Sequence, residues 1–243
     1  MVWTWPAFAQ PRSLMPYRRS TQAAPSVYLS LGGLALSAVA GYVNAVALAF
    51  FHVPISHMSG AVTHLGTDMI HGRTSAAVFL AGVLSSFLFG AMVSGLLIGA
   101  ARLEPSRRYG VALILEGLAL CFVALCFPRW PQAGLTAAAF ACGLQNGMAS
   151  SYYGLIVRTT HVTGILTDIG VLLGQFIRHR TLELWKLWIL GSILAGFLGG
   201  GMVGSLAGDY LSAMAFFLPA GGCLLAGAVY TILFWPDPKE RRP

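Results

Sequence analysis

Long apolar stretches separated by short polar ones make up most of the chain. Six of them are about 20 residues long, the length at which a helix crosses the roughly 30 Å hydrocarbon layer of a bilayer. They lie near residues 27–50, 77–101, 109–127, 132–154, 185–207 and 211–235. The pattern therefore predicts an all-α integral membrane protein with six transmembrane helices.

Composition and charge agree with a lipid environment. Of the 243 residues, 56% are hydrophobic and 9% are charged, whereas an ordinary soluble domain has about 25% charged residues. The net charge of +7 would suit a nucleic-acid partner, but the basic residues cluster at the ends of the apolar stretches, where they meet anionic lipid headgroups. The sequence favours the lipid bilayer as a partner and argues against nucleic acid.

A polar motif occurs twice in this apolar chain. SHMSGAVTHLG spans residues 56–66 and THVTGILTDIG spans residues 160–170. The two copies are identical at the pairs His57/His161, Gly60/Gly164, Thr63/Thr167 and Gly66/Gly170. A polar segment that is written twice in a membrane protein indicates a duplicated functional or structural unit.

Two further pairs of segments extend the duplication. GYVNA at 41–45 aligns with GLQNG at 143–147, and FLFGAMVSGL at 87–96 aligns with FLGGGMVGSL at 197–206, at offsets of 102 and 110 residues. The chain is therefore expected to contain two repeats of about 105 residues. The predicted parts are a cytoplasmic tail 1–26, a first membrane repeat 27–127, a linker 128–131, a second membrane repeat 132–235 and a cytoplasmic tail 236–243.

Basic residues indicate how the repeats are oriented. If the motif segments crossed the membrane, there would be eight spans and parallel repeats; if they do not, six spans remain and the repeats are inverted. Cytoplasmic flanks carry the excess of Lys and Arg. With six spans and the N-terminus inside, thirteen of the 15 Lys and Arg residues lie inside, and Arg73 and Arg129 lie outside. The sequence predicts two inverted three-helix repeats with both termini cytoplasmic.

Each motif has the features of a short re-entrant half-helix. Ser56 and Thr160 stand before a helical pattern, as N-cap residues do, and the segments that follow are short and polar for a span. Irregular backbone at membrane depth has to face protein or a water-lined cavity, and the N-terminal end of a broken helix can hold a solute. We expect one half-helix after the first span of each repeat, with its N-terminal end near the midplane.

The motifs also supply most of the predicted substrate pathway. His57, His64 and Asp68 share one helical face because 7 and 11 residues are nearly whole numbers of turns, and a polar face in a membrane needs water, a partner chain or a solute. Polar residues within the spans complete the set, although such residues also serve as hydrogen-bonding links between helices. The candidates are Asn44, Ser56, His57, Ser59, Gly60, Thr63, His64, Asp68, Gln145, Asn146, Thr160, His161, Thr163, Gly164, Thr167 and Asp168.

An isolated carboxyl group stands out within the third apolar stretch. Glu116 lies in ALILEGLALCF, with no charged residue within seven positions on either side. An ionisable residue in the middle of a span is a functional candidate, either as a proton carrier or as a counter-charge. Arg158, just before the second motif, is the natural partner for the second role. The alternative is a neutral, hydrogen-bonded Glu116 that stabilises the helix bundle.

The sequence predicts no metal site, no cofactor and no catalytic residue. His64, Asp68 and His71 have ligand chemistry on one helical face, but the second motif offers only Asp168 and Gln175 at the matching positions. The four cysteines lie in apolar stretches without CxxC or Cys/His spacing, which is typical of small buried hydrophobic residues.

Small residues recur every four positions in two of the apolar stretches. This spacing lets helix backbones approach closely, so we expect packing of repeat against repeat, with a homodimer through these glycine-rich helices as the alternative. The residues are Gly82, Ser86, Gly90 and Ser94 in the first repeat and Gly196, Gly200, Gly204 and Gly208 in the second.

The two motif segments and Glu116 together give the chain a family resemblance. SHMSG at 56–60, VRTTHVTG at 157–164 and the isolated carboxyl resemble the YoaK-like family of bacterial multi-pass inner-membrane proteins, over about residues 27–235. The resemblance implies a location in the bacterial inner (cytoplasmic) membrane and a family whose biochemical role is unassigned. Where that family often has TGN, this chain has Ser59, Gly60 and Ala61.

Three functions compete at this level. A transporter or channel for a small solute, with its pathway between the inverted repeats, accounts best for paired polar half-helices. A membrane-embedded enzyme that uses His, Asp and Glu for acid–base chemistry is one alternative, although no known catalytic motif supports it. An accessory subunit of another membrane protein is the other.

Overall fold

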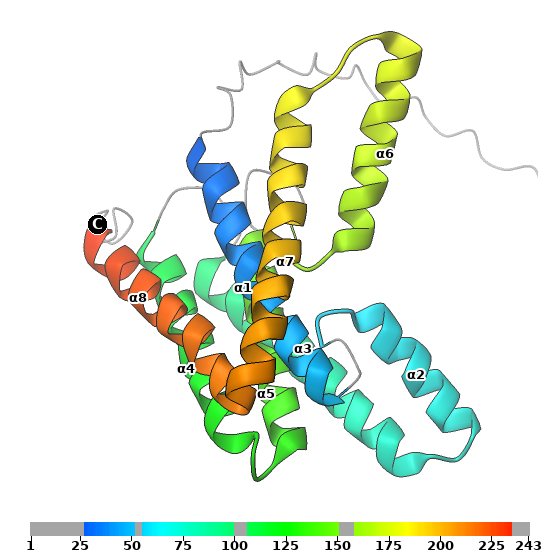
Figure 1. The fold of residues 1–243 in the computed structure, drawn as a ribbon, viewed down its shortest axis with the longest axis vertical. Helices are drawn as coiled ribbons and strands as arrows, with labels where there is room; N and C mark the ends of the chain where they lie inside the picture. Colours follow the sequence, from blue (N-terminus) through cyan, green and yellow to red (C-terminus); the bar gives the residue numbers. More distant parts are fainter. Residues whose placement is uncertain (1–26, 52–54, 100–105, 151–157, 235–243) are drawn as a thin grey trace, which may run out of the picture.

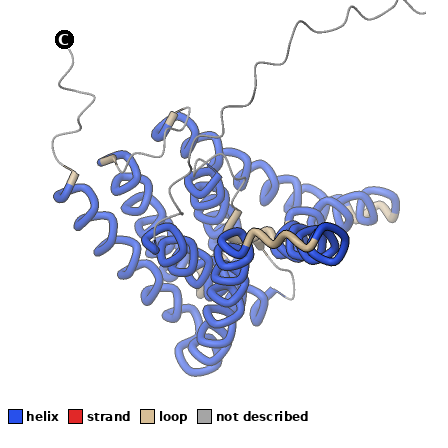
Figure 2. The backbone as a smooth tube through the Cα atoms, turned by 90° about the horizontal axis from the view of Figure 1, so that it is seen from above, coloured by secondary structure: helices blue, strands red, loops and turns tan. Residues whose placement is uncertain are grey.

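The computed structural model describes residues 27–51, 55–99, 106–150 and 158–234, and all regular secondary structure in these residues is helical (Figures 1 and 2). The all-helical prediction is therefore confirmed for this part of the chain. The helices are α1 (Val27–Phe51), α2 (Met58–Ile70), α3 (Thr74–Ile98), α4 (Arg107–Cys126), α5 (Pro131–Ser150), α6 (Val162–His179), α7 (Leu184–Leu211), the short 3₁₀ helix η1 (Ser212–Phe216) and α8 (Phe217–Leu233).

Four helical stretches are long and apolar enough to cross a membrane. They are Ser30–Phe50, Thr74–Ile98, Arg107–Cys126 and the 50-residue stretch Leu184–Leu233. The last of these comprises α7, η1 and α8, and it changes direction at Ser212, whose φ of 52° ends α7 in the left-handed region. These stretches give the chain the character of a helical membrane protein.

Helix α1 packs along α7, and the two helices run parallel (Figure 1). Glycines on α7 make this close approach possible, because a Cβ atom on Gly200 would overlap the carbonyl oxygen of Ala38. The contacts advance together along both helices: Gly196 meets Leu34, Gly200 meets Ala38 and Gly204 meets Tyr42. The four-residue spacing of the glycines therefore serves packing within the chain.

Helix α3 packs along α5 in the same manner. A Cβ atom on Gly143 would overlap the carbonyl oxygen of Phe87, just as one on Gly41 of α1 would overlap that of Phe197 on α7. Gly143 follows Gly41 by 102 residues (143 minus 41), and Phe197 follows Phe87 by 110 (197 minus 87). The first helix of each half, α1 or α5, thus packs against the third helix of the other half, α7 or α3. The residues in contact are related by the same offsets, 102 and 110, as the aligned segments.

Helices α4 and α8 form the third close pair, and they run antiparallel. Gly110 near the start of α4 meets Gly227 and Thr231 near the end of α8, whereas Gly117 meets Ala220 and Leu224 near its start. Helices α4 and α8 therefore run in opposite directions, whereas the two helices of the α1–α7 pair, and those of the α3–α5 pair, run in the same direction.

The two motif helices lie at the edge of the bundle (Figure 1). Among the described helices, α2 packs against α3 and α6 packs against α7. Figure 1 places α2 beside α3 at the lower right and α6 beside α7 at the top right. Each motif helix therefore packs against one of the two parallel pairs, α2 on the α3–α5 pair and α6 on the α1–α7 pair.

The largest apolar core fills one end of the bundle. The Phe127 ring, at the end of α4, lies 4.9 Å from the Phe50 ring of α1 and 5.8 Å from the Phe216 ring of η1, measured between centroids. Nearby, the Tyr42 hydroxyl donates a hydrogen bond of 2.9 Å to the Ala215 carbonyl. These contacts hold the end of α1 against α4 and η1, and we call them the aromatic closure.

Candidate functional site

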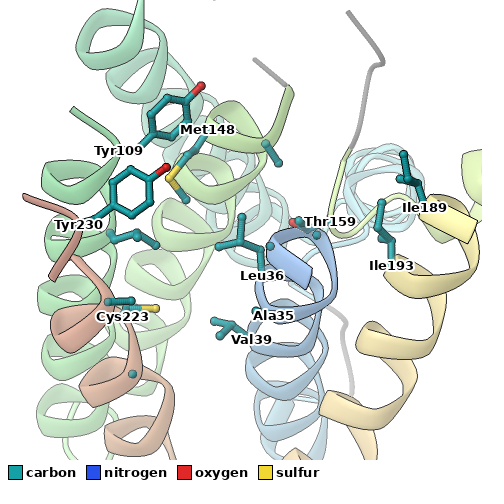
Figure 3. Close-up of a pocket in the computed structure, with 16 residues that line it drawn as sticks. Ala35, Leu36, Val39, Tyr109, Met148, Thr159, Ile189, Ile193, Cys223 and Tyr230 are labelled. Carbon is teal, nitrogen blue, oxygen red and sulfur yellow. The ribbon is translucent and has the colours of Figure 1, made fainter. Parts of the chain in front are cut away.

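A cavity of about 410 Å³ lies between α1, α4, α5, α7 and α8 (Figure 3). Its wall is mostly aliphatic, and Figure 3 shows Leu36 and Val39 of α1 facing Tyr230 and Cys223 of α8 across it. A cavity of a few hundred Å³ with an apolar wall and few polar groups is typical of small-molecule sites. The lining residues are Gly32, Gly33, Ala35, Leu36, Val39, Tyr109, Leu113, Met148, Ala149, Thr159, Ile189, Ile193, Gly222, Cys223, Ala226 and Tyr230.

The cavity and the aromatic closure occupy opposite halves of the bundle. Its lining residues come from the first parts of α1, α4 and α7, from the end of α5, and from residues 222–230 of α8. The aromatic closure lies where α1 and α4 end and where η1 precedes α8. The cavity therefore lies towards one end of the bundle and the aromatic closure towards the other, and a second, more open pocket of about 500 Å³ reaches Tyr42 of the closure between α1, α7 and the start of α8.

Glu116 lies behind the wall of this cavity. Its side chain is buried, with 2% relative exposure, and it is hydrogen-bonded to the side chain of Cys223, which itself lines the cavity. Its Oε2 atom has no hydrogen-bond partner among the described residues. A single side chain thus separates a carboxyl group with unused hydrogen-bonding capacity from a space that can hold a ligand.

Arg158 does not supply the counter-charge in this structure. Arg158 is exposed, and it forms no ion pair with Glu116, although both residues are described. The groups near the carboxyl are the thiols of Cys223 on α8 and Cys142 on α5. The pairing with Arg158 is therefore absent here, and the proton-carrier role and the neutral, hydrogen-bonded role of Glu116 both stay predictions.

Each motif is tied to the helix before it by a buried asparagine. In the first half, Asn44 Oδ1 accepts hydrogen bonds from the Ser56 hydroxyl at 2.8 Å and from its backbone N–H at 3.3 Å. In the second half, Asn146 Nδ2 donates to the Thr160 hydroxyl at 2.8 Å, and Asn146 Oδ1 accepts from the Thr159 hydroxyl at 3.5 Å. The residues are buried in both halves, so these bonds fix the start of each motif at the side of α1 or α5.

The N-cap prediction for Ser56 and Thr160 is wrong. The N-cap positions are His57 and His161, neither of which makes a side-chain capping bond. The Ser56 hydroxyl instead donates to Asn44, and the Thr160 hydroxyl accepts from Asn146.

The deep end of the first motif lies near the middle of α7. The His57 ring is half-buried, and its centroid is 6.2 Å from that of Phe197, the fourteenth residue of the 28 in α7. His161 is exposed at the equivalent position. Their role in lining a pathway stays a prediction.

Most other motif residues lie on the outside of the bundle. The hydroxyls of Thr63 and Thr167 donate to the carbonyls four residues earlier, which satisfies them within their own helices. Asp68 is buried and forms an ion pair of 2.8 Å with Arg73 at the end of α2. Ser59, His64, Thr163 and Asp168 are exposed, and Gly60 and Gly164 are half-buried.

Sequence reasoning missed several residues of the cavity. Gln145 was among the candidates, and its Nε2 atom donates to the Leu36 carbonyl at 2.8 Å, linking α5 to α1 beside the cavity. Thr159, Tyr109, Tyr230 and Cys223 were not. The doublet Thr159–Thr160 beside the second motif was a usable signal, whereas the apolar surroundings of Cys223 gave none.

The asparagine links lead to a stability prediction. Replacing Asn146 with alanine leaves the buried hydroxyls of Thr159 and Thr160 without their partner, so it should lower the free energy of unfolding by about 2 kcal/mol. Unfolding in detergent micelles with added denaturant measures the change. Gln132→Ala, at an exposed position on the same helix, is the control and should change it by less than about 0.5 kcal/mol. Equal effects of the two substitutions would rule out a structural role for the link.

The fold and the cavity together define a helical membrane protein. The chain belongs to the family described as protein of unknown function (DUF1275), whose model matches residues 32–229. This agrees with the expectation of a family whose role is unassigned. No curated protein and no solved structure matches the chain.

Proposed function

We propose that the chain is a transporter for a small solute in the bacterial inner membrane, in which two inverted three-helix repeats open a central cavity to the two sides in turn. The observation that carries this proposal is the cavity at one end of the bundle combined with the aromatic closure at the other. A transporter in one of its two end states has this asymmetry, open to one side and packed on the other. The proposal also includes the resemblance to the YoaK-like family, which is the basis for the location in the bacterial inner membrane.

The direction of the helices supports six spans and inverted repeats. If α6 crossed the membrane, α4 and α8 would be separated by an odd number of crossings and would run parallel. The two helices pack antiparallel, as six spans with α2 and α6 as re-entrant half-helices require. With the basic flanks on the cytoplasmic side, the cavity opens towards the cytoplasm and the aromatic closure lies at the outer side.

Repeat-related helix pairs differ in the way that alternating access requires. The duplication relates α1 to α5 and α8 to α4. Helix α5 packs along α4, whereas α1 and α8 make few contacts with each other and both line the cavity. Inverted repeats that exchange such conformations close the cavity on one side and open it on the other.

The helix pairs suggest which parts move. Helices α1 and α7 are locked together by close glycine contacts, as are α3 and α5, so each pair moves as one rigid arm against the α4–α8 pair. The asparagine links couple each motif to the first helix of one arm. We propose that the motifs follow these helices, which brings His57 and His161 to the pathway when the arms rock.

Uptake into proteoliposomes tests the proposal. A screen of metabolite mixtures should find at least one solute that accumulates above the level in protein-free liposomes. Leu36→Trp, which fills part of the cavity, should reduce uptake at least about tenfold, whereas Leu88→Trp, at an exposed position on α3, should leave it unchanged. Equal uptake by both variants would place the pathway elsewhere, and a failure of every solute would contradict a transport function.

The membrane-embedded enzyme is the second candidate, because a buried carboxyl beside a cavity also suits acid–base catalysis. Among the described residues, the polar groups that line the cavity are few and include no histidine or carboxylate, which favours transport. Chemical conversion of a solute without its accumulation would favour the enzyme.

A further inference from the structure

The solute class follows from what the cavity wall and Glu116 offer together. The wall is aliphatic and aromatic, and Figure 3 shows the rings of Tyr109 and Tyr230 lying close together beside Met148. Aromatic faces attract cations as well as apolar groups. The wall therefore suits a molecule with an apolar body. The charge that the bound molecule should carry depends on the acidic and basic side chains near the cavity.

Glu116 carries a carboxyl group near the cavity, and no described residue forms an ion pair with it. Cys142 on α5 and Cys223 on α8 are the titratable side chains that face it from the described helices packed against α4, and a thiol carries no positive charge. Arg108, the nearest basic residue in the sequence, lies eight positions earlier on α4, which is roughly 12 Å along the helix axis.

An uncompensated carboxylate in such an environment is costly, so the carboxyl holds a proton unless a cation takes its place. Oε2 of Glu116 has no hydrogen-bond partner in the described structure. Cys223 lines the cavity and is hydrogen-bonded to Glu116, so the carboxyl lies next to a side chain that a bound molecule would touch.

We propose that the cavity binds a small organic cation with an apolar body, of the aryl or alkyl ammonium class, in exchange for the proton of Glu116. This inference rests on the proposed transport function, which it extends to a solute class and a coupling ion. As the cation enters from the cytoplasmic side, the O–H bond of the Glu116 carboxyl breaks and the proton leaves through the cavity to water. The carboxylate then balances the charge of the cation, so the charge within the membrane is the same before and after exchange.

Binding to the purified full-length protein in a neutral detergent tests the exchange without requiring transport. Phenyltrimethylammonium and tert-butylbenzene have nearly the same shape and differ in charge, so they form a matched pair of probes. Calorimetry measures the affinity of each, and a pH indicator in weakly buffered solution measures proton release. We expect the cation to bind at least about tenfold more tightly than its neutral analogue at alkaline pH, to release about one proton for each cation bound, and to bind more weakly as the pH falls, because protons then compete.

Two variants and one control assign the effect to the site. Glu116→Gln should abolish proton release and remove the preference for the cation, while tert-butylbenzene still binds. Leu36→Trp, which narrows the cavity and leaves Glu116 in place, should lose both probes. Glu183→Gln removes an exposed carboxyl at the start of α7 and should behave as the unmodified protein.

The outcomes separate this inference from the proposed function. Equal affinity for the two probes, or cation binding without proton release, would overturn the exchange even if another solute is taken up by proteoliposomes. Cation binding with proton release that depends on Glu116 supports the inference, even if the proteoliposomes show no uptake and the transport proposal fails.

Discussion

Replacing Gly200 with alanine is expected to lower the free energy of unfolding by about 3 kcal/mol, the upper part of the range for overpacking. A Cβ atom at this position would overlap the backbone carbonyl of Ala38, and backbone in the middle of a helix has little room to move. The α1–α7 pair would therefore have to separate along its length. Because this pair forms one wall of the cavity, the loss of stability should be accompanied by a loss of uptake.

The adjacent glycine is a matched control. At Gly199 a Cβ atom would meet nothing within 4 Å, so Gly199→Ala should be neutral or stabilising by up to about 1 kcal/mol, since alanine is the better helix former. Unfolding in micelles compares the two variants. Similar stability of Gly199→Ala and Gly200→Ala would mean that α1 and α7 do not pack as closely as described.

The α3–α5 pair allows an independent test of the same kind. Gly143 stands in the same relation to Phe87 as Gly41 does to Phe197. Gly143→Ala should therefore resemble Gly200→Ala in its effect, with Gly82→Ala on α3 as the neutral control, because a Cβ atom there meets nothing within 4 Å.

The sequence predicted the helices more reliably than their contacts. The first apolar stretch, 27–50, corresponds to α1 (Val27–Phe51), and the third, 109–127, to α4 (Arg107–Cys126), because continuous apolar runs bounded by polar or charged residues leave few alternatives to a helix in a membrane. The division of the 50-residue run Leu184–Leu233 was also predictable, since it is twice the length of one span.

The candidate site was predicted only in part, for physical reasons. Periodicity identified Asn44 and Asn146 as polar residues within apolar helices, but which partner each finds depends on where the chain returns after the helix, and that is a tertiary property. Cavities are less predictable still, because a cavity is the space that packed helices leave unfilled. The two halves have similar sequences, yet α4 and α5 pack extensively whereas the related helices α1 and α8 make few contacts beside the cavity, and sequence similarity cannot reveal such a difference.

Rocking of the α1–α7 and α3–α5 arms should change the α1–α8 distance and the α1–α4 distance in opposite directions. This is the second large effect that we expect. In the present structure the cavity lies between α1 and α8 at one end of the bundle, the cavity end, while the aromatic closure holds α1 against α4 and η1 at the other, the closure end. Movement of the α1–α7 arm towards α8 must shorten the first separation and lengthen the second, because the arm is rigid along its close glycine contacts.

Spin labels at exposed positions can follow both distances. One pair, Leu31→Cys with Val229→Cys, joins α1 to α8 at the cavity end, and the other, Ala49→Cys with Leu125→Cys, joins α1 to α4 at the closure end. Cys121 and Cys126 are replaced by alanine in this background, whereas Cys142 and Cys223 are buried and can stay.

The measurement that tests alternating access most directly is the pair of distance distributions, recorded in lipid nanodiscs over a range of pH and with phenyltrimethylammonium added. Alternating access predicts two populations in exchange. One has a long α1–α8 distance and a short α1–α4 distance, and the other has a short α1–α8 distance and a long α1–α4 distance. A change of conditions should shift both distributions together. A single fixed distance for each pair, or two distances that lengthen together, would contradict a transporter that opens to one side at a time.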